Sequence, residues 1–308
     1  LNFVGGDRHE KKLRQVVEHY TNLKVLGAIR RNDALSLEER YLGLIPSNED
    51  IQAVEKTQAL GNIISSQVDL DALIEISTPI PPVHITSKKI NASFNLRIGY
   101  AKDRAFGFYY PDDLETFQQL GATLVPFDTL MDKDLPDVDA IFIGGGFPET
   151  QMALLEKNAT MRNAVKEAIE NGLPCYAECG GLMYLSKSIT WGDTTCNMSG
   201  VINGDITLHE KPQGRGYIRI KATDDCLWQT SYANQKEICA HEFHYSSLNN
   251  LPADTIYAYD VLRGAGINGK HDGIVYRNMM ACYAHLRNTQ QSPWVEGFVK
   301  FVQQCKRT

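Results

Sequence analysis

The stretch LPCYAECGGLMYLSKSI, residues 173–189, decides how this chain is understood. An apolar run ends at Cys179, two glycines follow, and a second apolar run begins at once. This order predicts a buried strand, a tight turn at the cysteine and an apolar helix. A strand that leads directly into a helix is typical of an α/β fold with a parallel sheet.

Such a turn holds its central residue in a strained backbone conformation and needs small residues two positions before and two positions after it. Ala177 and Gly181 meet this requirement. The start of the helix favours a thiolate at Cys179, and the Gly180 N–H is placed to stabilise an oxyanion. Most cysteines are buried structural thiols, so that alternative stands beside the interpretation of Cys179 as a nucleophile.

A glycine triplet supplies a second candidate for the site. The run DAIFIGGG, residues 139–146, predicts a buried strand that enters the loop Gly144–Gly145–Gly146. Glycines allow backbone amides to approach a ligand closely, so Gly145 is expected to provide the other half of an oxyanion hole. Taken alone, a glycine triplet before Phe-Pro indicates only a loop.

A cysteine nucleophile needs a base, and we expect a histidine at the end of a later strand. His285 ends the apolar run 280–284 and is the preferred base. His241 and His244 alternate with Glu242 along a predicted strand, which makes Glu242 and His244 substrate-side candidates, with a structural role as the alternative. The other histidines are expected on a solvated helix, in a linker or in polar loops: His9, His19, His84, His209 and His271.

The flanking patterns predict two α/β domains. In the first, a helix covers 8–23, a strand covers 24–29, and two helices lie within 47–77. A proline-containing linker spans 79–94. In the second domain, over 95–308, strands are predicted at 96–101 and 122–127, and helices at 111–122, 158–172 and 292–305.

Composition narrows the class of protein. The 308 residues carry a net charge of -6, which argues against a nucleic-acid partner or a membrane-surface partner. No apolar run is long enough to span a membrane, and no signal peptide is visible, so a cytoplasmic location is expected. Seven dispersed cysteines form no CxxC pair, so neither a disulfide framework nor a metal site is predicted.

Several motifs together carry a family resemblance: AFGFYYPDDLETFQQLGA, IGGGFPE, AECGGLMYL, HEFHYS and YAHL. Over roughly 95–305 the chain resembles the class I glutaminase domain of the cobyrinic acid a,c-diamide synthases. Residues 1–78 are similar to the C-terminal half of that family's ATP-dependent amidoligase domain, which is dethiobiotin synthetase-like. The implied fold is α/β, with two doubly wound parallel-sheet domains, the second a class I glutaminase (flavodoxin-like) fold.

The resemblance implies a carbon–nitrogen ligase of cobalamin biosynthesis with glutamine as the amide donor. Cys179 attacks glutamine, the Gly145 and Gly180 amides hold the oxyanion, and His285 acts as the base. The released ammonia amidates acetate carboxylates (a and c) of a tetrapyrrole, which ATP and Mg²⁺ activate in the complete enzyme. Cobyrinate, hydrogenobyrinate, nickel-sirohydrochlorin and sirohaem stay open as substrates, and the oligomeric state stays open too, with a homodimer among the alternatives.

Two departures from the family pattern modify these expectations. Arg287 stands where many glutaminases of the triad type carry a glutamate, so we expect a Cys–His dyad, with Glu242 as the alternative third member. No phosphate loop G-x-x-x-x-G-K-[ST] occurs, and the first residue is Leu. We therefore expect a missing N-terminal nucleotide-binding segment, left by a truncation or by a split gene.

Two other functions remain as alternatives. One is a cysteine hydrolase of the same fold that acts on small amides or peptides. The other is a non-catalytic interaction protein. The ligase-like first segment argues against the hydrolase, and the intact Cys179, glycine turn and His285 argue against the interaction protein.

Overall fold

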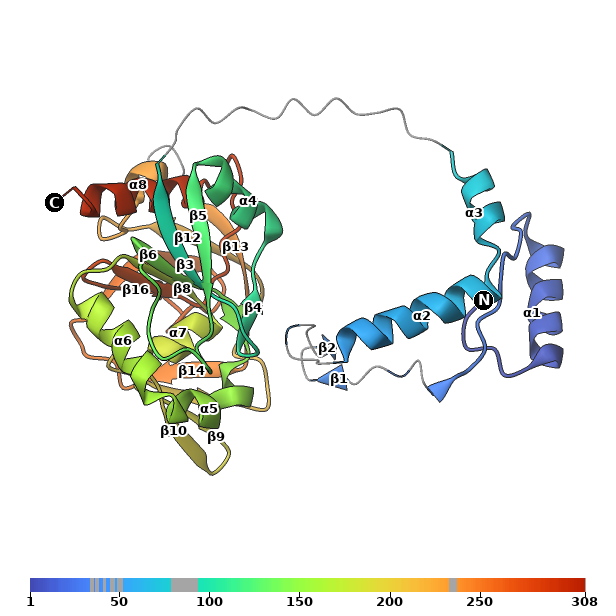
Figure 1. The fold of residues 1–308 in the computed structure, drawn as a ribbon, viewed down its shortest axis with the longest axis horizontal. Coiled ribbons are helices and arrows are strands. Elements are labelled where there is room, and N and C mark those ends of the chain that lie inside the picture. Colours follow the sequence, from blue (N-terminus) through green and yellow to red (C-terminus); the bar gives the residue numbers. More distant parts are fainter. Residues whose placement is uncertain are drawn as a thin grey trace. The chain divides into compact units, whose positions relative to one another are not determined.

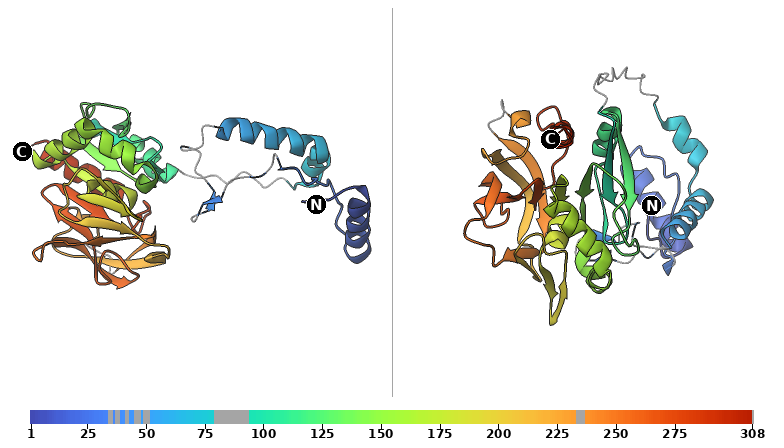
Figure 2. Two further views of the ribbon diagram at one scale, coloured as in Figure 1. Left: turned by 90° about the horizontal axis from the view of Figure 1, so that it is seen from below. Right: turned by 60° about the vertical axis from the view of Figure 1, so that its left-hand side comes forward.

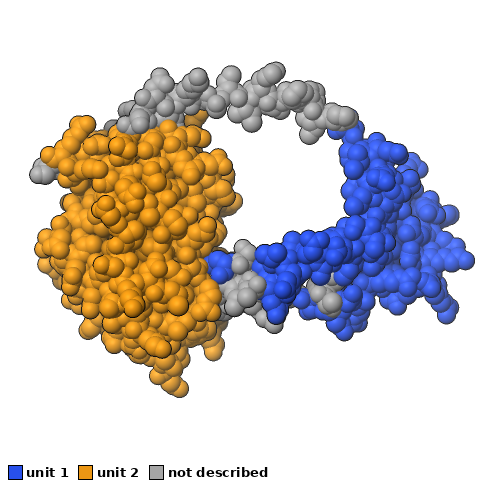
Figure 3. All heavy atoms as spheres, in the orientation of Figure 1, with its two compact units in different colours: residues 1–88 blue, residues 89–308 orange. Residues whose placement is uncertain are grey.

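The computed structural model describes residues 1–33, 36, 39–40, 43–44, 48, 52–78, 94–232 and 237–307. The chain divides into two compact units, residues 1–88 and 89–308 (Figure 3). The predicted linker at 79–94 lies, except for Phe94, outside the described residues, as does His84. The identification of residues 1–78 as half of an amidoligase domain stays a prediction.

The helices and strands can be followed in Figure 1. The helices are α1 (Asp7–Tyr20), α2 (Ala53–Gln67), α3 (Leu70–Ile76), α4 (Pro111–Gln119), η2 (Pro148–Gln151), α5 (Met152–Lys157), α6 (Ala159–Glu170), α7 (Gly180–Leu185), η3 (Gln229–Tyr232) and α8 (Trp294–Cys305). The strands are β1 (Glu39–Arg40), β2 (Gly43–Leu44), β3 (Leu96–Ala101), β4 (Phe106–Phe108), β5 (Ala122–Phe127), β6 (Ala140–Ile143), β7 (Gly145–Gly146), β8 (Cys175–Glu178), β9 (Ser188–Trp191), β10 (Thr194–Asn197), β11 (Asp205–Leu208), β12 (Gly214–Ala222), β13 (Ile238–His244), β14 (Ser246–Asn249), β15 (Ile256–Arg263), β16 (His271–Tyr276) and β17 (Met279–Cys282).

A nine-stranded sheet forms the centre of the second unit, in the order β13-β12-β15-β16-β17-β8-β6-β3-β5. From β17 to β5 every neighbouring pair is parallel. Numbered along the chain, these five strands have the order 2-1-3-4-5, which is the flavodoxin-like arrangement. The predicted fold class is therefore confirmed for this unit.

The other half of the sheet is antiparallel, which the sequence patterns do not predict. The strands β13, β12, β15, β16 and β17 pair antiparallel in that order. This half brings β13, which carries the predicted substrate-side residues, into the same sheet as the parallel strands. It also makes β17 the junction, because β17 pairs antiparallel with β16 and parallel with β8.

A four-stranded sheet of order β10-β9-β11-β14 follows α7. Its β9–β10 hairpin projects at the lower end of the unit in Figure 1 and in the right-hand view of Figure 2. A further short ladder joins β4 to β7, so that Gly145 and Gly146 lie beside Phe108 and Phe106. This ladder holds the glycine loop in an extended conformation.

Helices cover both faces of the large sheet. One buried cluster contains Met161, Val165 and Ile169 of α6 together with the apolar side chains of α7. The other contains Phe117 of α4 and Trp294 of α8. Because β-strand side chains alternate between faces, Ala177 packs in the first cluster and Tyr176 in the second. Each strand end can therefore present side chains to either layer.

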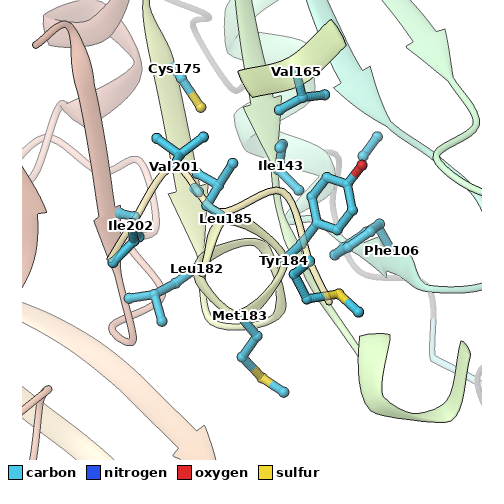
Figure 4. Close-up of a cluster of buried hydrophobic side chains, with 14 of the residues drawn as sticks. Phe106, Ile143, Val165, Cys175, Leu182, Met183, Tyr184, Leu185, Val201 and Ile202 are labelled. Atoms are coloured by element: carbon cyan, nitrogen blue, oxygen red, sulfur yellow. The ribbon is translucent and has the colours of Figure 1, made fainter. Parts of the chain in front are cut away.

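The short helix α7 is buried along its whole length, with every residue from Gly180 to Leu185 inaccessible or nearly so. Figure 4 shows Leu182, Tyr184 and Leu185 of this helix in the cluster that also includes Ile143 of β6. A helix that is apolar on all sides is expected only where sheet and loops surround it. This explains why the apolar run after Cys179 continues without a polar face.

The first unit differs from the second in how little apolar surface it buries. The predicted helices at 8–23 and within 47–77 correspond to α1, α2 and α3, but α1 and α2 contain no buried residue. The predicted strand at 24–29 is not a strand: only isolated bridges occur, Gly27 with Val68 and Val4 with Arg30. A doubly wound sheet in this unit stays a prediction. No helix in the described part of the chain is long and apolar enough to cross a membrane.

Candidate active site

Cys179 occupies the turn between β8 and α7. Its backbone has φ 47° and ψ -98°, a region that few residues other than glycine adopt, so the strained turn predicted from the sequence is present. A Cβ at Gly181 would lie 2.1 Å from the carbonyl oxygen of Ile143, which explains the need for a small residue there. The Cys179 thiol is almost fully buried and faces the backbone oxygen of Phe243 at 3.9 Å.

His285 follows β17, the strand next to β8, and its imidazole hydrogen bonds with the Cys179 thiol. Its backbone is fixed by a two-way bridge to His241, with N–O distances of 2.7 and 3.2 Å. Burial lowers the pKa of His285, but hydrogen bonds and charge interactions with Cys179 and Glu178 outweigh burial and raise this pKa to about 10. The imidazole of His285 is therefore expected to be protonated near pH 7.

The two glycine segments, which contain Gly145 and Gly180, lie close to each other beside His285. A Cβ at Gly145 would lie 2.6 Å from Cε1 of His285, so the glycine backbone passes directly beside the imidazole. A Cβ at Gly180 would lie 2.9 Å from the backbone nitrogen of Gly146. Gly180 is the first residue of α7, where a helix leaves its N–H groups without intrahelical partners. The two predicted oxyanion donors are thus in neighbouring segments.

Glu178 is the site residue that the sequence did not predict. Its buried carboxylate accepts hydrogen bonds at Oε1 from the Tyr176 hydroxyl (2.6 Å) and from the Leu286 N–H (2.9 Å). The other oxygen, Oε2, lies 3.4 Å from Nδ1 of His285. The sequence does contain a signal for Glu178, because side chains alternate between the two faces of a strand. Tyr176 and Glu178 therefore lie on one face of β8, and Ala177 lies on the other.

Glu242, the alternative third catalytic member, is bound to another part of the backbone. Glu242 accepts hydrogen bonds from the backbone N–H groups of Ala265 (2.7 Å) and Gly266 (2.9 Å), one on each carboxylate oxygen. Arg287 pairs with Asp112 at 2.9 Å on the surface and does not orient His285. The geometry therefore does not support Glu242 as the partner of the imidazole, and Arg287, as expected for a basic residue, does not take this role.

His244 lies at the end of β13 and is buried. Its ring stacks on that of Tyr283, with centroids 3.8 Å apart, and Nδ1 is 2.8 Å from the carbonyl oxygen of Ser246. Nε2 has no hydrogen-bond partner and lies 3.9 Å from Glu242. Burial is the main reason why the pKa of His244 falls to about 4, so this ring is neutral near pH 7. Its substrate-side role stays a prediction.

Buried carboxylates also fix the backbone on either side of His285. Asp272 accepts hydrogen bonds from the N–H groups of Tyr283 (3.0 Å) and Ala284 (2.9 Å). Asp113 of α4 accepts one from the N–H of Asn288 at 2.8 Å. Sequence reasoning missed both residues, since nothing in their local patterns marks them. The backbone around His285 is therefore set by groups from several separate elements.

Comparison with known proteins gives a consistent result. Residues 97–292 match the family of CobB/CobQ-like glutamine amidotransferase domains. A cobyrinate a,c-diamide synthase of Magnetococcus marinus is 40% identical over 98% of this chain and 66% of its own length. One of Archaeoglobus fulgidus is 37% identical over 97% of this chain and 65% of its own length. The chain thus spans slightly less than two thirds of the curated relatives it matches.

Among solved structures, PurLQS from Thermotoga maritima aligns with a TM-score of 0.51. The alignment covers 68% of this chain and 98% of the other, at 13% identity. At this identity the similarity concerns the fold alone.

Proposed function

The chain belongs to the family of CobB/CobQ-like glutamine amidotransferase domains, and from this premise we propose that its second unit releases ammonia from glutamine at Cys179. The observation that carries the proposal is the arrangement at the ends of β8 and β17. Cys179 is held on a strained turn, and its thiol is hydrogen bonded to a histidine whose pKa is raised. A buried structural thiol needs neither feature.

In the proposed reaction, the Cys179 thiolate attacks the side-chain amide carbon of glutamine. The carbonyl π electrons move onto the oxygen, and the resulting oxyanion is held by the N–H groups of Gly145 and Gly180. The tetrahedral intermediate collapses as the imidazolium of His285 protonates the leaving nitrogen. Ammonia departs and a thioester remains on Cys179.

The second half of the reaction returns the enzyme to its starting state. His285, now neutral, removes a proton from water as the water attacks the thioester carbon. Collapse of this second intermediate releases glutamate and restores the thiolate beside the imidazolium. The protons balance, because His285 gives one proton to the leaving nitrogen and takes one proton from water.

The use of the ammonia is the wider part of the proposal. The relatives' name suggests that it amidates the a and c acetate carboxylates of a tetrapyrrole such as cobyrinate. ATP and Mg²⁺ would activate the carboxylate, as the resemblance implies. The 308 residues contain no phosphate loop, so no residue of this chain is assigned to ATP or to Mg²⁺, and no step is derived through them. A cytoplasmic location stays a prediction.

The proposal is tested by the release of glutamate from glutamine by this chain. We expect turnover in the wild type and a loss of at least about 10³-fold in Cys179→Ala, because the nucleophile is removed. Cys239→Ala is the matched control, since this cysteine is exposed on β13 and should leave the rate unchanged. A chloroketone analogue of glutamine should label Cys179 selectively, as shown by peptide mass mapping.

Three outcomes would count against the proposal. Equal rates in wild type and Cys179→Ala would exclude this cysteine as the nucleophile. Rapid hydrolysis of other small amides, with glutamine a poor substrate, would favour the alternative cysteine hydrolase. The absence of both glutamate release and selective labelling would return Cys179 to a structural role.

A further inference from the structure

We infer that Glu178 is the positioning residue of this site, a carboxylate that holds His285 in its working tautomer and orientation from the position directly before the nucleophile. The inference rests on the proposed glutamine hydrolysis and deepens it. It replaces the expected dyad with a three-residue arrangement in which two members are adjacent in sequence and the third comes from the neighbouring strand.

The two carboxylate oxygens of Glu178 have different partners. Oε1 receives both structural hydrogen bonds, from the Tyr176 hydroxyl and from the Leu286 N–H. These contacts fix the carboxylate plane and connect it to the residue that directly follows His285. Oε2 is left to face Nδ1 of His285 at 3.4 Å.

A carboxylate beside Nδ1 also suits the chemistry proposed for His285. An oxygen acceptor at Nδ1 favours the tautomer that carries its proton there, so that Nε2 is free to serve the thiol. The negative charge also stabilises the imidazolium that the reaction requires. A separation of 3.4 Å is long for a hydrogen bond, but such contacts commonly tighten when substrate binds.

The contact between Glu178 and His285 is buried. The side chains of Glu178 and His285 are 4% and 7% exposed, so their interaction is poorly screened by water. A buried carboxylate needs partners, and the three groups named here satisfy this one. Tyr176 is itself fully buried among Phe142, Trp228 and Trp294, which leaves its hydroxyl few alternative positions.

The other buried acidic residues of this region bind backbone N–H groups. Both oxygens of Glu242 are hydrogen bonded to the backbone of another loop. Asp272 and Asp113 bind backbone N–H groups beside His285 rather than its ring. Among the described residues, Glu178 is the acidic side chain that forms an ion-pair contact with His285.

The test is Glu178→Gln, which changes as little as possible. Its side-chain oxygen can still accept from Tyr176 and Leu286, while the NH₂ group takes the place of Oε2 and repels a proton on Nδ1. We expect kcat for glutamine hydrolysis to fall by about 10²-fold or more, with KM changed by less than about threefold. The alkaline limb of the pH profile should move to lower pH, because the imidazolium has lost its counter-charge.

The matched control is Glu170→Gln. Glu170 accepts a hydrogen bond from the Tyr276 hydroxyl at 2.9 Å on the surface, so the same tyrosine–glutamate pair is altered away from the site. We expect it to leave kcat and the pH profile unchanged. Glu178→Ala is a further variant that removes the structural hydrogen bonds as well, and it should lower the melting temperature more than Glu178→Gln does.

A second readout separates this inference from the proposed function. In ¹⁵N-histidine NMR spectra we expect the pKa of His285 to fall and the Nδ1 proton to be lost in Glu178→Gln. An active wild type together with an equally active Glu178→Gln would overturn the inference and leave the glutaminase intact. A wild type that does not hydrolyse glutamine would overturn the proposed function, and unchanged His285 spectra would overturn the positioning role in either case.

Discussion

At the scale of single residues, the proposed site contains a buried thiol and a buried imidazole. The thiol of Cys179 and the ring of His285 lie inside the protein, where water screens charge poorly. Burial alone would keep His285 neutral, yet the contacts with Cys179 and Glu178 raise its pKa to about 10 from an ordinary value of 6.5. The imidazole of His285 is thus expected to stay charged across the physiological pH range.

This shift has a defined consequence for pH dependence. Because the pKa in the folded state lies above that in the unfolded chain, the interaction contributes its full stability below about pH 6.5 and loses it as the pH rises towards 10. The free energy of unfolding of the second unit should therefore fall as the pH is raised from about 6.5 towards 10. Urea unfolding curves measured at several pH values in this range check this.

Removal of the histidine should make the thiol less reactive. In His285→Gln we expect alkylation of Cys179 by iodoacetamide at pH 7 to slow by about tenfold or more, since the base beside the thiol is gone. Cys239→Ala in both backgrounds removes the signal of an exposed thiol. Equal rates in the two proteins would show that the ring does not activate the thiol.

At the scale of elements, the turn geometry depends on the contact between α7 and β6. The helix lies so close to the strand that a Cβ at Gly181 would come 2.1 Å from the Ile143 oxygen. A backbone atom cannot move aside as a side chain can, so the helix itself must shift. That shift would also displace the N–H of Gly180, which precedes Gly181 at the start of the helix.

We predict that Gly181→Ala lowers the free energy of unfolding of the second unit by about 1–3 kcal/mol, because of overpacking, and slows glutamine hydrolysis as well. Gly99→Ala in β3 is the control: its Cβ would meet the Ile141 and Val138 methyl groups at 3.3 Å, and these can yield. We expect it to cost less than about 1 kcal/mol. Urea unfolding followed by tryptophan fluorescence measures both, and equal costs would contradict the argument.

At the scale of the whole molecule, the two units differ in the burial that stabilises them. Both large hydrophobic clusters are built only from residues beyond 93. In the first unit the buried apolar side chains among the described residues are Val4, Ala28 and Ala72. Apolar burial is the main source of stability, so the second unit should be the more stable one.

We therefore predict that residues 94–308 fold without the first unit. Calorimetry should show their melting temperature within about 2 °C of the main transition of the full chain. The full chain should show, in addition, a weaker transition at lower temperature. A single shared transition, or a shorter chain that fails to fold, would show that the first unit supports the second.

The sequence by itself determined the local features of this protein. The alternation of apolar strands and amphipathic helices identified the parallel half of the sheet, and small residues around Cys179 identified the strained turn. The glycine loop and the position of His285 after an apolar strand followed from the same patterns. These features could be predicted because a turn or a periodic helix is specified by residues close together in the chain.

Only the tertiary structure decided which side chains meet. Glu178 reaches His285 because β8 and β17 are parallel neighbours, although the two residues are 107 positions apart. Glu242, also acidic, instead accepts hydrogen bonds from the backbone N–H groups of Ala265 and Gly266. The antiparallel half of the sheet and the absence of a strand at 24–29 also depend on distant partners. Local sequence patterns predict which segments form strands, turns or helices. The pairing of distant segments depends instead on the packing of the whole unit.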